Sequence, residues 1–160
     1  MKALLFSAIR EHKLVDMPLP AIGRPDEVLL KVKSVGVCGS DLHGYTGGSG
    51  RRIPPMIMGH EATGEVVAVG EGVADLPIGA RAAIQPVLFC GECAQCRAGH
   101  SNVCERRRVM GVNAPGAFAE YVVWPRRNLF ELPESLSFEY GALTEPLAVA
   151  VHAVALARTG

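Results

Sequence analysis

Residues 27–43, EVLLKVKSVGVCGSDLH, contain an apolar strand that leads directly into a group of polar and sulfur-bearing side chains. In residues 27–37, β-branched and apolar residues partly alternate with polar ones, which is typical of a strand with one buried face. Similar but shorter runs occur at residues 2–6, 65–69, 81–87 and 118–124. Short strands joined by Gly- and Pro-rich turns predict a mainly β fold with short helices, of the barrel or sandwich type.

The last quarter of the chain is predicted to be helical. Residues 137–143 and 146–158 are rich in Ala and Leu, Pro146 suits the first turn of the second helix, and Gly160 suits its C-terminal cap. The second helix is apolar on most sides, so we expect another part of a protein to cover it. No Gly-x-Gly-x-x-Gly motif occurs, so the chain carries no recognisable dinucleotide-binding unit.

Length and composition favour a single cytoplasmic domain over residues 1–160. The 16 basic and 16 acidic residues give zero formal net charge, so nothing indicates nucleic acid or a membrane surface as a partner. We find no apolar run approaching the roughly 20 residues of a membrane span, and no signal peptide at the N-terminus. Four of the five cysteines are clustered, which indicates a metal site rather than a disulfide scaffold.

The clustered cysteines, Cys90, Cys93, Cys96 and Cys104, follow the spacing C-x2-C-x2-C-x7-C. Short spacings let a tight turn present two thiolates to one ion, and zinc takes four ligands in a tetrahedron. We therefore predict a closed, structural zinc site in a lobe of about residues 88–108. The alternatives are buried free thiols or an iron–sulfur cluster. Four arginines beside the lobe either offset the thiolate charge or form a solvated surface: Arg97, Arg106, Arg107 and Arg108.

A second group of candidate ligands is spread over two segments. Cys38 follows the strand at residues 27–37, and His60 and Glu61 come further along the chain. Taken singly, the cysteine reads as buried filler and the His-Glu pair as surface. Together they supply sulfur, nitrogen and oxygen donors, the ligand set of a catalytic zinc with an open position. Ser40 and His43 add a hydroxyl and an imidazole suited to moving a proton between the site and solvent.

The order and spacing of these segments resemble the zinc-containing medium-chain dehydrogenases. The matching segments are residues 36–43 (GVCGSDLH), 59–66 (GHEATGEV), the cysteine lobe and residues 116–121 (GAFAEY). Residues 145–153 (EPLAVAVHA) are most similar to the sorbitol and polyol branch, with threonine dehydrogenase close by. The resemblance extends over essentially the whole chain.

The resemblance implies a GroES-like β-barrel catalytic domain that holds two zinc ions. Cys38, His60 and Glu61 match the ligands of the family's catalytic zinc. Glu145 occupies the position at which the family has either a further zinc ligand or a carboxylate that contacts the ligands. Ser40 and His43 match the hydroxyl and histidine of the family's proton relay. The family's structural-zinc ligands are matched by Cys90, Cys93, Cys96 and Cys104.

The implied activity is oxidation of a secondary alcohol or polyol to a ketone, with hydride transfer to NAD or NADP. Family members bind the nucleotide in a Rossmann domain, which is absent from this chain. We therefore expect residues 137–158 to lead toward that domain, the isolated chain to be inactive, and the full-length protein to be a homo-oligomer. The alternatives are a non-enzymatic zinc-binding module kept for interaction and a dehydrogenase of amino alcohols such as threonine.

Some residues depart from the family pattern or have a structural interpretation. Many polyol enzymes place an aromatic residue directly after the relay histidine, whereas this chain has Gly44 there and Tyr45 next. Because of that departure, the resemblance does not predict the shape of the substrate pocket. We interpret His152 as a helix-packing residue, and Asp41 and Glu65 as structural carboxylates.

Overall fold

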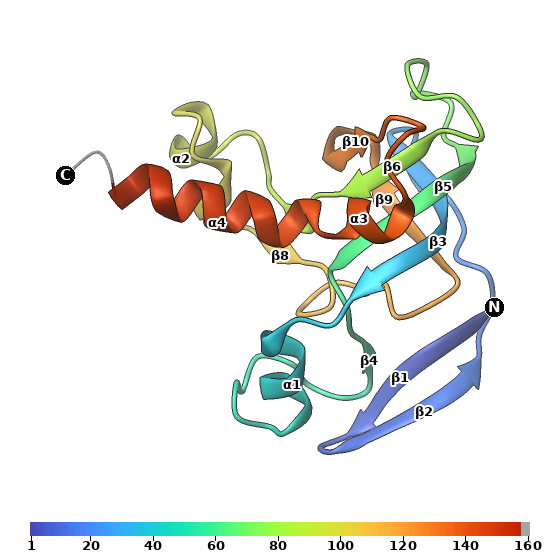
Figure 1. The fold of residues 1–160 in the computed structure, drawn as a ribbon, viewed down its shortest axis with the longest axis vertical. Coiled ribbons are helices and arrows are strands. Elements are labelled where there is room, and N and C mark those ends of the chain that lie inside the picture. Colours follow the sequence, from blue (N-terminus) through green and yellow to red (C-terminus); the bar gives the residue numbers. More distant parts are fainter. Residues whose placement is uncertain (158–160) are drawn as a thin grey trace.

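The computed structural model describes residues 1–157, in which antiparallel sheets surround a hydrophobic core and two helices end the described chain (Figure 1). The largest sheet has the strand order β10-β6-β5-β3-β9, a second has the order β2-β1-β4, and β7 pairs with β8. The strands are β1 (Lys2–Ala8), β2 (Glu11–Asp16), β3 (Glu27–Gly36), β4 (Met56–Ile57), β5 (Glu61–Val69), β6 (Arg81–Ile84), β7 (Val87–Leu88), β8 (Arg108–Val109), β9 (Tyr121–Pro125) and β10 (Leu129–Glu131). The α-helices are α1 (Gly39–Tyr45), α2 (Ala94–Arg97), α3 (Phe138–Ala142) and α4 (Thr144–Ala157).

Strand β3 lies at the centre of the core, between β5 and β9. Val28 and Leu30 of β3 are fully buried, and they pack in one cluster with Val66 of β5 and Trp124 of β9. Full burial of an aliphatic side chain of this size contributes about 1.5–3 kcal/mol, so these contacts hold the three strands in register. The same strand carries the first candidate ligand just beyond its end.

The smaller sheet closes against the larger one through β1. The Leu4 amide donates to the Phe118 carbonyl at 2.8 Å, and the Glu120 amide donates to the Lys2 carbonyl at 3.0 Å. The pairing of β3 with β5 also shifts register twice, and such irregularities increase the bend of a strand. The sheets therefore curve around the core, and the prediction of a mainly β fold with short helices is confirmed.

The strand bounds differ from the sequence prediction at several points. The predicted strand 65–69 is the second half of β5, which begins at Glu61, and the predicted strand 81–87 divides into β6 and β7. Pro86 explains the division, because proline has no N–H to donate to a ladder. Four short strands were not predicted, namely β2, β4, β8 and β10.

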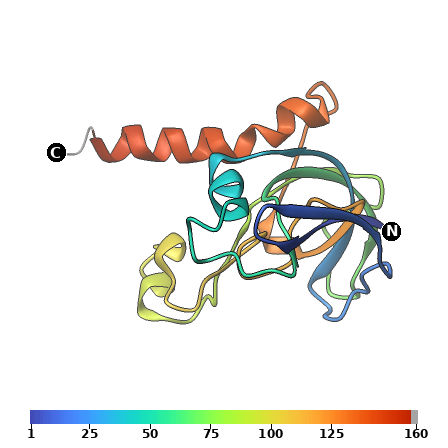
Figure 2. The ribbon, with the colours of Figure 1, turned by 90° about the horizontal axis from the view of Figure 1, so that it is seen from below.

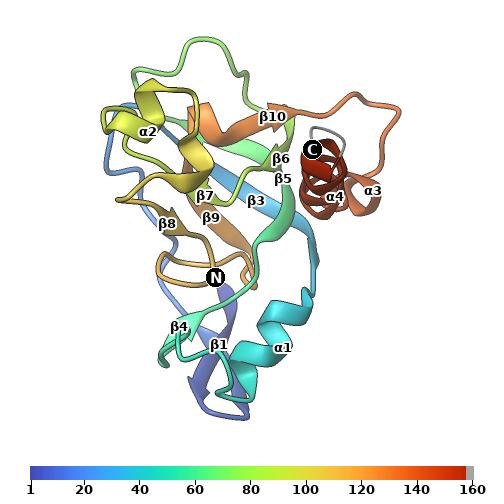
Figure 3. The same cartoon turned by 90° about the vertical axis from the view of Figure 1, so that its left-hand side faces the viewer.

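Helices α3 and α4 lie on one side of the large sheet, where α4 contacts β5 and β6 (Figure 3). Helix α4 begins at Thr144, two residues before the predicted start, and Pro146 lies in its first turn as predicted. The rest of α4 projects away from the sheets (Figure 2), and none of its described side chains is buried. The predicted helix end at Arg158 and the predicted cap at Gly160 lie outside the described residues.

Residues Phe138–Ala157 form the one helical segment within residues 1–157 that is long and apolar enough to cross a membrane, judged by length and composition alone. The sequence-based statement that no apolar run approaches this length is therefore wrong for this segment. Part of the segment packs on the domain, since Gly141 and Ala142 of α3 are buried and α3 contacts β3 and β5. The apolar side chains of α4 are exposed, as expected of a helix that another protein segment covers.

Candidate metal centres

The pairing of β3 with β5 brings Cys38, His60 and Glu61 together. In this antiparallel pair Gly36, at the end of β3, lies opposite Glu61, the first residue of β5. Cys38 caps the N-terminus of α1 just after β3, and His60 directly precedes β5. One ligand atom from each of the three side chains lies within 4.8 Å of the others. The three candidate ligands of the open site are therefore neighbours in space.

Cys38 marks the point where strand β3 gives way to helix α1. Its Sγ accepts a hydrogen bond from the Ser40 amide at 3.5 Å, and the Cys38 amide donates to Asp41 Oδ2 at 3.1 Å. These two reciprocal bonds form a capping box, which satisfies amides that would otherwise be unpaired at the start of the helix. The helix start thereby fixes the position of the sulfur.

Asp41 connects this cap to His60. The Asp41 side chain is buried, and its Oδ1 lies 3.5 Å from His60 Nδ1, a buried atom with no closer hydrogen-bond partner among the described residues. Because Nδ1 faces Asp41, Nε2 is the atom that His60 can offer to a metal. Burial lowers the pKa of His60, but Asp41 and Cys38 outweigh it and raise that pKa to about 9. Asp41 was predicted to be a structural carboxylate. The structure shows, in addition, that it lies against His60, a candidate metal ligand.

The same network acts on Asp41 itself. Burial raises the pKa of the Asp41 carboxyl, whereas His60, the Cys38 amide and the Arg52 guanidinium lower it, and the lowering prevails. A carboxylate that stays ionised beside an imidazole orients the ring and strengthens its remaining nitrogen as a ligand. Sequence analysis missed Arg52, because its neighbours Arg51 and Ile53 belong to no recognised motif.

Glu145, in the first turn of α4, lies near the three-residue group but is not one of its members. Burial raises the pKa of the Glu145 carboxyl, the charge of His60 lowers it and the charge of Glu61 raises it, so both residues are within electrostatic range. Glu145 also borders a cavity of about 420 Å³ together with Gln85 and His152. His152 is exposed at this cavity, which differs from the predicted packing role.

Ser40 and His43, the predicted proton path, are both exposed and lie one turn apart on α1. Ser40 Oγ accepts a hydrogen bond from Arg52 Nη2 at 3.1 Å. The His43 ring packs so closely on Gly48 that a Cβ atom at Gly48 would overlap it. Both side chains therefore have defined neighbours at the boundary between the site and solvent.

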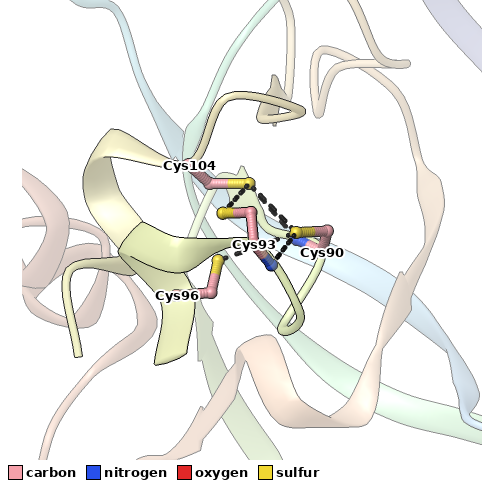
Figure 4. A group of neighbouring side chains, drawn as sticks. All are labelled: Cys90, Cys93, Cys96 and Cys104. Atoms are coloured by element: carbon pink, nitrogen blue, oxygen red, sulfur yellow. Dashed lines mark hydrogen bonds between the residues drawn. The ribbon is translucent and has the colours of Figure 1, made fainter. Parts of the chain in front are cut away.

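The four clustered cysteines face one another in the lobe around α2 (Figure 4). Their Sγ atoms are separated by 3.5 Å for Cys90 and Cys104, 3.8 Å for Cys90 and Cys96, and 4.0 Å for Cys93 and Cys104. Tetrahedral zinc with Zn–S bonds of about 2.3 Å separates its sulfur ligands by about 3.8 Å. A disulfide needs about 2.0 Å, and all five cysteines are free thiols. The spacing fits a closed tetrahedral metal site.

The electrostatics of the lobe also fit a bound cation. Backbone amides of Glu92 and Cys93 lower the pKa of Cys90 to about 6, whereas burial and the neighbouring thiols raise the pKa of Cys96 to about 12. Four sulfurs this close cannot all ionise unless a cation balances their charge. The donor set therefore suits a divalent metal that takes thiolate ligands.

All four arginines beside the lobe are exposed, as a surface role predicts; one of them lies where it can offset thiolate charge, and the other three donate to backbone carbonyls. Arg106 pairs with Glu92 at 2.6 Å and lies close enough to Cys90 for the thiol to help raise its pKa. Arg97 donates to the Glu92 carbonyl at 2.5 Å, and Arg108 donates to the Asn113 carbonyl at 3.1 Å. Arg106 thus offsets thiolate charge, while Arg97 and Arg108 bind the local backbone.

Comparison with known proteins agrees with this geometry. The profile of the family described as the alcohol dehydrogenase GroES-like domain matches residues 24–134. The chain belongs to this family. Membership confirms the resemblance to zinc-containing medium-chain dehydrogenases and, with it, the expected GroES-like fold.

Named relatives of this GroES-like domain are dehydrogenases. The chain is 42% identical to sorbitol dehydrogenase from Bacillus subtilis (strain 168), over 97% of this chain and 45% of that protein. It is 45% identical to L-threonine 3-dehydrogenase from Francisella tularensis subsp. novicida (strain U112), over 86% of this chain and 40% of that protein. A crystal structure from Sinorhizobium meliloti 1021, described as a zinc-binding dehydrogenase bound to NADP, superposes with a TM-score of 0.90 at 40% identity, covering 97% of this chain and 45% of that one. The chain thus spans less than half the length of each.

Proposed function

We propose that residues 1–160 form the catalytic, zinc-binding domain of a dehydrogenase that oxidises a secondary alcohol to a ketone with NAD or NADP. The observation that carries this proposal is the convergence of Cys38, His60 and Glu61. Three protein donors leave a position where a substrate oxygen can bind, whereas the four-cysteine lobe, at residues 88–108, has a full set of donors and serves structure. A non-enzymatic module would need no open site.

The residues of this chain have distinct parts in the proposed reaction. Cys38, His60 and Glu61 would hold zinc, which as a Lewis acid makes the substrate hydroxyl more acidic. Asp41 holds the His60 ring so that its Nε2 atom is the one offered to the metal, beside the other two candidate ligands, Cys38 and Glu61. Ser40 receives the hydroxyl proton as it passes its own proton to His43, and His43 releases a proton to solvent. The nicotinamide supplies the hydride acceptor.

Glu145 would act as a second carboxylate at this site. Burial raises the pKa of the Glu145 carboxyl, the charge of His60 lowers it and the charge of Glu61 raises it, and because the raising prevails Glu145 holds a proton more readily than a free glutamate does. We propose that Glu61 and Glu145 exchange roles as water or substrate enters and leaves. The adjoining cavity, which Glu145 and His152 border, has room for a small molecule beside them.

The proposed substrate class is a polyol or another compound with a secondary hydroxyl group. Similarity to sorbitol dehydrogenase extends over more of the chain, whereas identity to threonine dehydrogenase is slightly higher over a shorter stretch. An amino alcohol is therefore the second candidate. A panel of polyols, simple secondary alcohols and threonine, assayed with NAD and with NADP on the full-length protein, separates these substrates.

We further propose that the full-length protein works in the cytoplasm as a homo-oligomer. The five free thiols suit a reducing compartment, where zinc rather than disulfide formation occupies clustered cysteines. Light scattering on the full-length protein tests the assembly.

Metal content tests the proposed function directly. Elemental mass spectrometry on the purified full-length protein should find roughly two zinc ions per chain, one lost on mild chelation and one resistant. Cys38→Ser should remove the labile ion and the dehydrogenase activity together. Retention of both zinc and turnover by Cys38→Ser would show that the ligand assignment is wrong.

A further inference from the structure

Arg52 is a buried cation next to the open site. It lies in the segment that joins α1 to β4, and its side chain is 4% exposed. A guanidinium in such a position is costly unless its N–H groups have acceptors. The acceptors are the Gly111 carbonyl at 3.0 Å from Nε, and Asp41 Oδ1 and Ser40 Oγ, each at 3.1 Å from Nη2. Arg52 therefore contacts two residues of the candidate site and one distant backbone turn.

The chain makes room for this side chain at Gly44. A Cβ atom at Gly44 would overlap the Cδ atom of Arg52, so no larger residue fits there while Arg52 keeps its position. Gly44 is itself buried on α1. The glycine and the buried arginine thus form one local arrangement.

The hydrogen bonds of Arg52 constrain the proton path. Arginine has no acceptor atoms, so Ser40 Oγ must accept from Nη2, and the Ser40 hydroxyl proton is left to be donated elsewhere. The other N–H of Nη2 is directed at Asp41 Oδ1, the same oxygen that faces His60 Nδ1. One nitrogen of Arg52 therefore orients both the candidate relay hydroxyl and the carboxylate behind a candidate ligand.

We infer that Arg52 is a positioning residue of the active site, which holds Asp41 against His60 and directs the Ser40 hydroxyl away from the guanidinium. This inference rests on the proposed function, because it concerns the same site. Lysine at position 52 could take over only some of these hydrogen bonds. Its ammonium group is a point donor and cannot reach three acceptors in the planar geometry of the guanidinium. Glycine at position 44 is a requirement of the same arrangement.

The test measures metal geometry rather than activity alone. In the full-length protein, the labile zinc is exchanged for cobalt while the cysteine lobe keeps its zinc, and the absorption spectrum and the cobalt dissociation constant are recorded. We expect Arg52→Met to weaken cobalt binding roughly 10- to 100-fold and to change the spectrum, as losses of residues that orient metal ligands do. Arg52→Lys should restore part of both. The matched control is Arg51→Met, which removes the exposed neighbouring arginine and should leave both unchanged.

The outcomes separate this inference from the proposed function. If the unsubstituted protein takes no cobalt at the labile site, the proposed function fails. If it takes cobalt and both Arg52 variants bind it with unchanged affinity and spectrum, Arg52 has no positioning role. Should Arg52→Met fail to fold, as judged by circular dichroism and loss of the lobe zinc, Arg52→Lys decides, because it keeps the positive charge that Asp41 needs.

Discussion

Gly36 lies directly opposite Glu61 in the pairing of β3 with β5, and a Cβ atom at Gly36 would overlap Glu61 Oε2. The absence of a side chain at Gly36 therefore provides the space that the Glu61 carboxylate occupies. Gly36 has no side chain that could bind a metal, yet the position of a candidate metal ligand depends on it.

Substituting Gly36 should therefore disturb the open site without disturbing the lobe. We expect Gly36→Ala to weaken the labile metal about tenfold or more, because the added methyl group displaces the Glu61 carboxylate from its position. The measurement is metal affinity by competition with a chelator. Gly39→Ala is the control, since a methyl group at Gly39 meets no atom within 4 Å. Equal affinities in the two variants would show that Glu61 does not need this space.

Gly48 has a similar relationship to His43. We expect Gly48→Ala to displace the His43 ring and to lower the turnover of the full-length protein about tenfold to a hundredfold, while both zinc ions remain bound; this is less than the roughly 10²- to 10⁴-fold of a proton-transfer group that is removed outright. Gly50→Ala is the control, because Gly50 has a φ of 60° and the substitution strains the backbone of the same loop, while its methyl group meets no atom within 4 Å and so leaves the His43 ring in place. Steady-state kinetics and zinc content on both variants test the prediction, which fails if Gly50→Ala causes the larger loss of turnover.

Cys104 should be critical for the lobe. It is fully buried, and its sulfur lies within 4.0 Å of those of Cys90 and Cys93. Replacement by serine removes a thiolate ligand from a closed site, so we expect Cys104→Ser to lose the chelation-resistant zinc and to make the lobe sensitive to proteolysis. Zinc content should fall by about one ion per chain, and the labile ion should remain. Retention of both ions would contradict a metal site at the four cysteines.

Leu30 should contribute strongly to the stability of the core around β3. Its side chain is fully buried on β3, so Leu30→Ala should lower the free energy of unfolding by about 2–5 kcal/mol. Leu14→Ala on β2 should change it by less than about 0.5 kcal/mol, because Leu14 is 70% exposed. Urea unfolding followed by tryptophan fluorescence provides the measurement, and Trp124 in the same core cluster is the reporter. Similar losses in both variants would mean that β3 is not the centre of the core.

Sequence reasoning succeeded where the signal is local. The spacing of Cys90, Cys93 and Cys96 within a few residues predicts that their sulfurs meet, and the structure brings them together with Cys104. The alternation in β3 is confirmed in part: Lys31 and Lys33 are exposed on either side of the half-buried Val32, whereas Leu29 is buried like its neighbours Val28 and Leu30. Such patterns depend on residues that are neighbours along the chain.

Sequence reasoning was weaker where the structure depends on long-range pairing. The proximity of Cys38 to His60 and Glu61 arises from the register of β3 with β5, and the resemblance to a family, rather than any local pattern, supported it. Arg52 could not be found in this way, because its acceptor at Gly111 is 59 positions away. Strand β2 was missed because its residues are mostly polar and none is buried, so an apolar pattern is weak there.

Helix α4 has a mechanical consequence for the site. It holds Glu145 in its first turn, and its described 14 residues extend about 21 Å at the usual rise of an α-helix. A helix this short is stiff, so any tilt applied to its far end turns it as a rod about the junction with α3 at Leu143. Because Glu145 lies only two residues from this pivot, a large displacement of the outer turns of α4 would become a small change in how far Glu145 stands from His60 and Glu61, so the helix would act on the site as a lever that reduces movement.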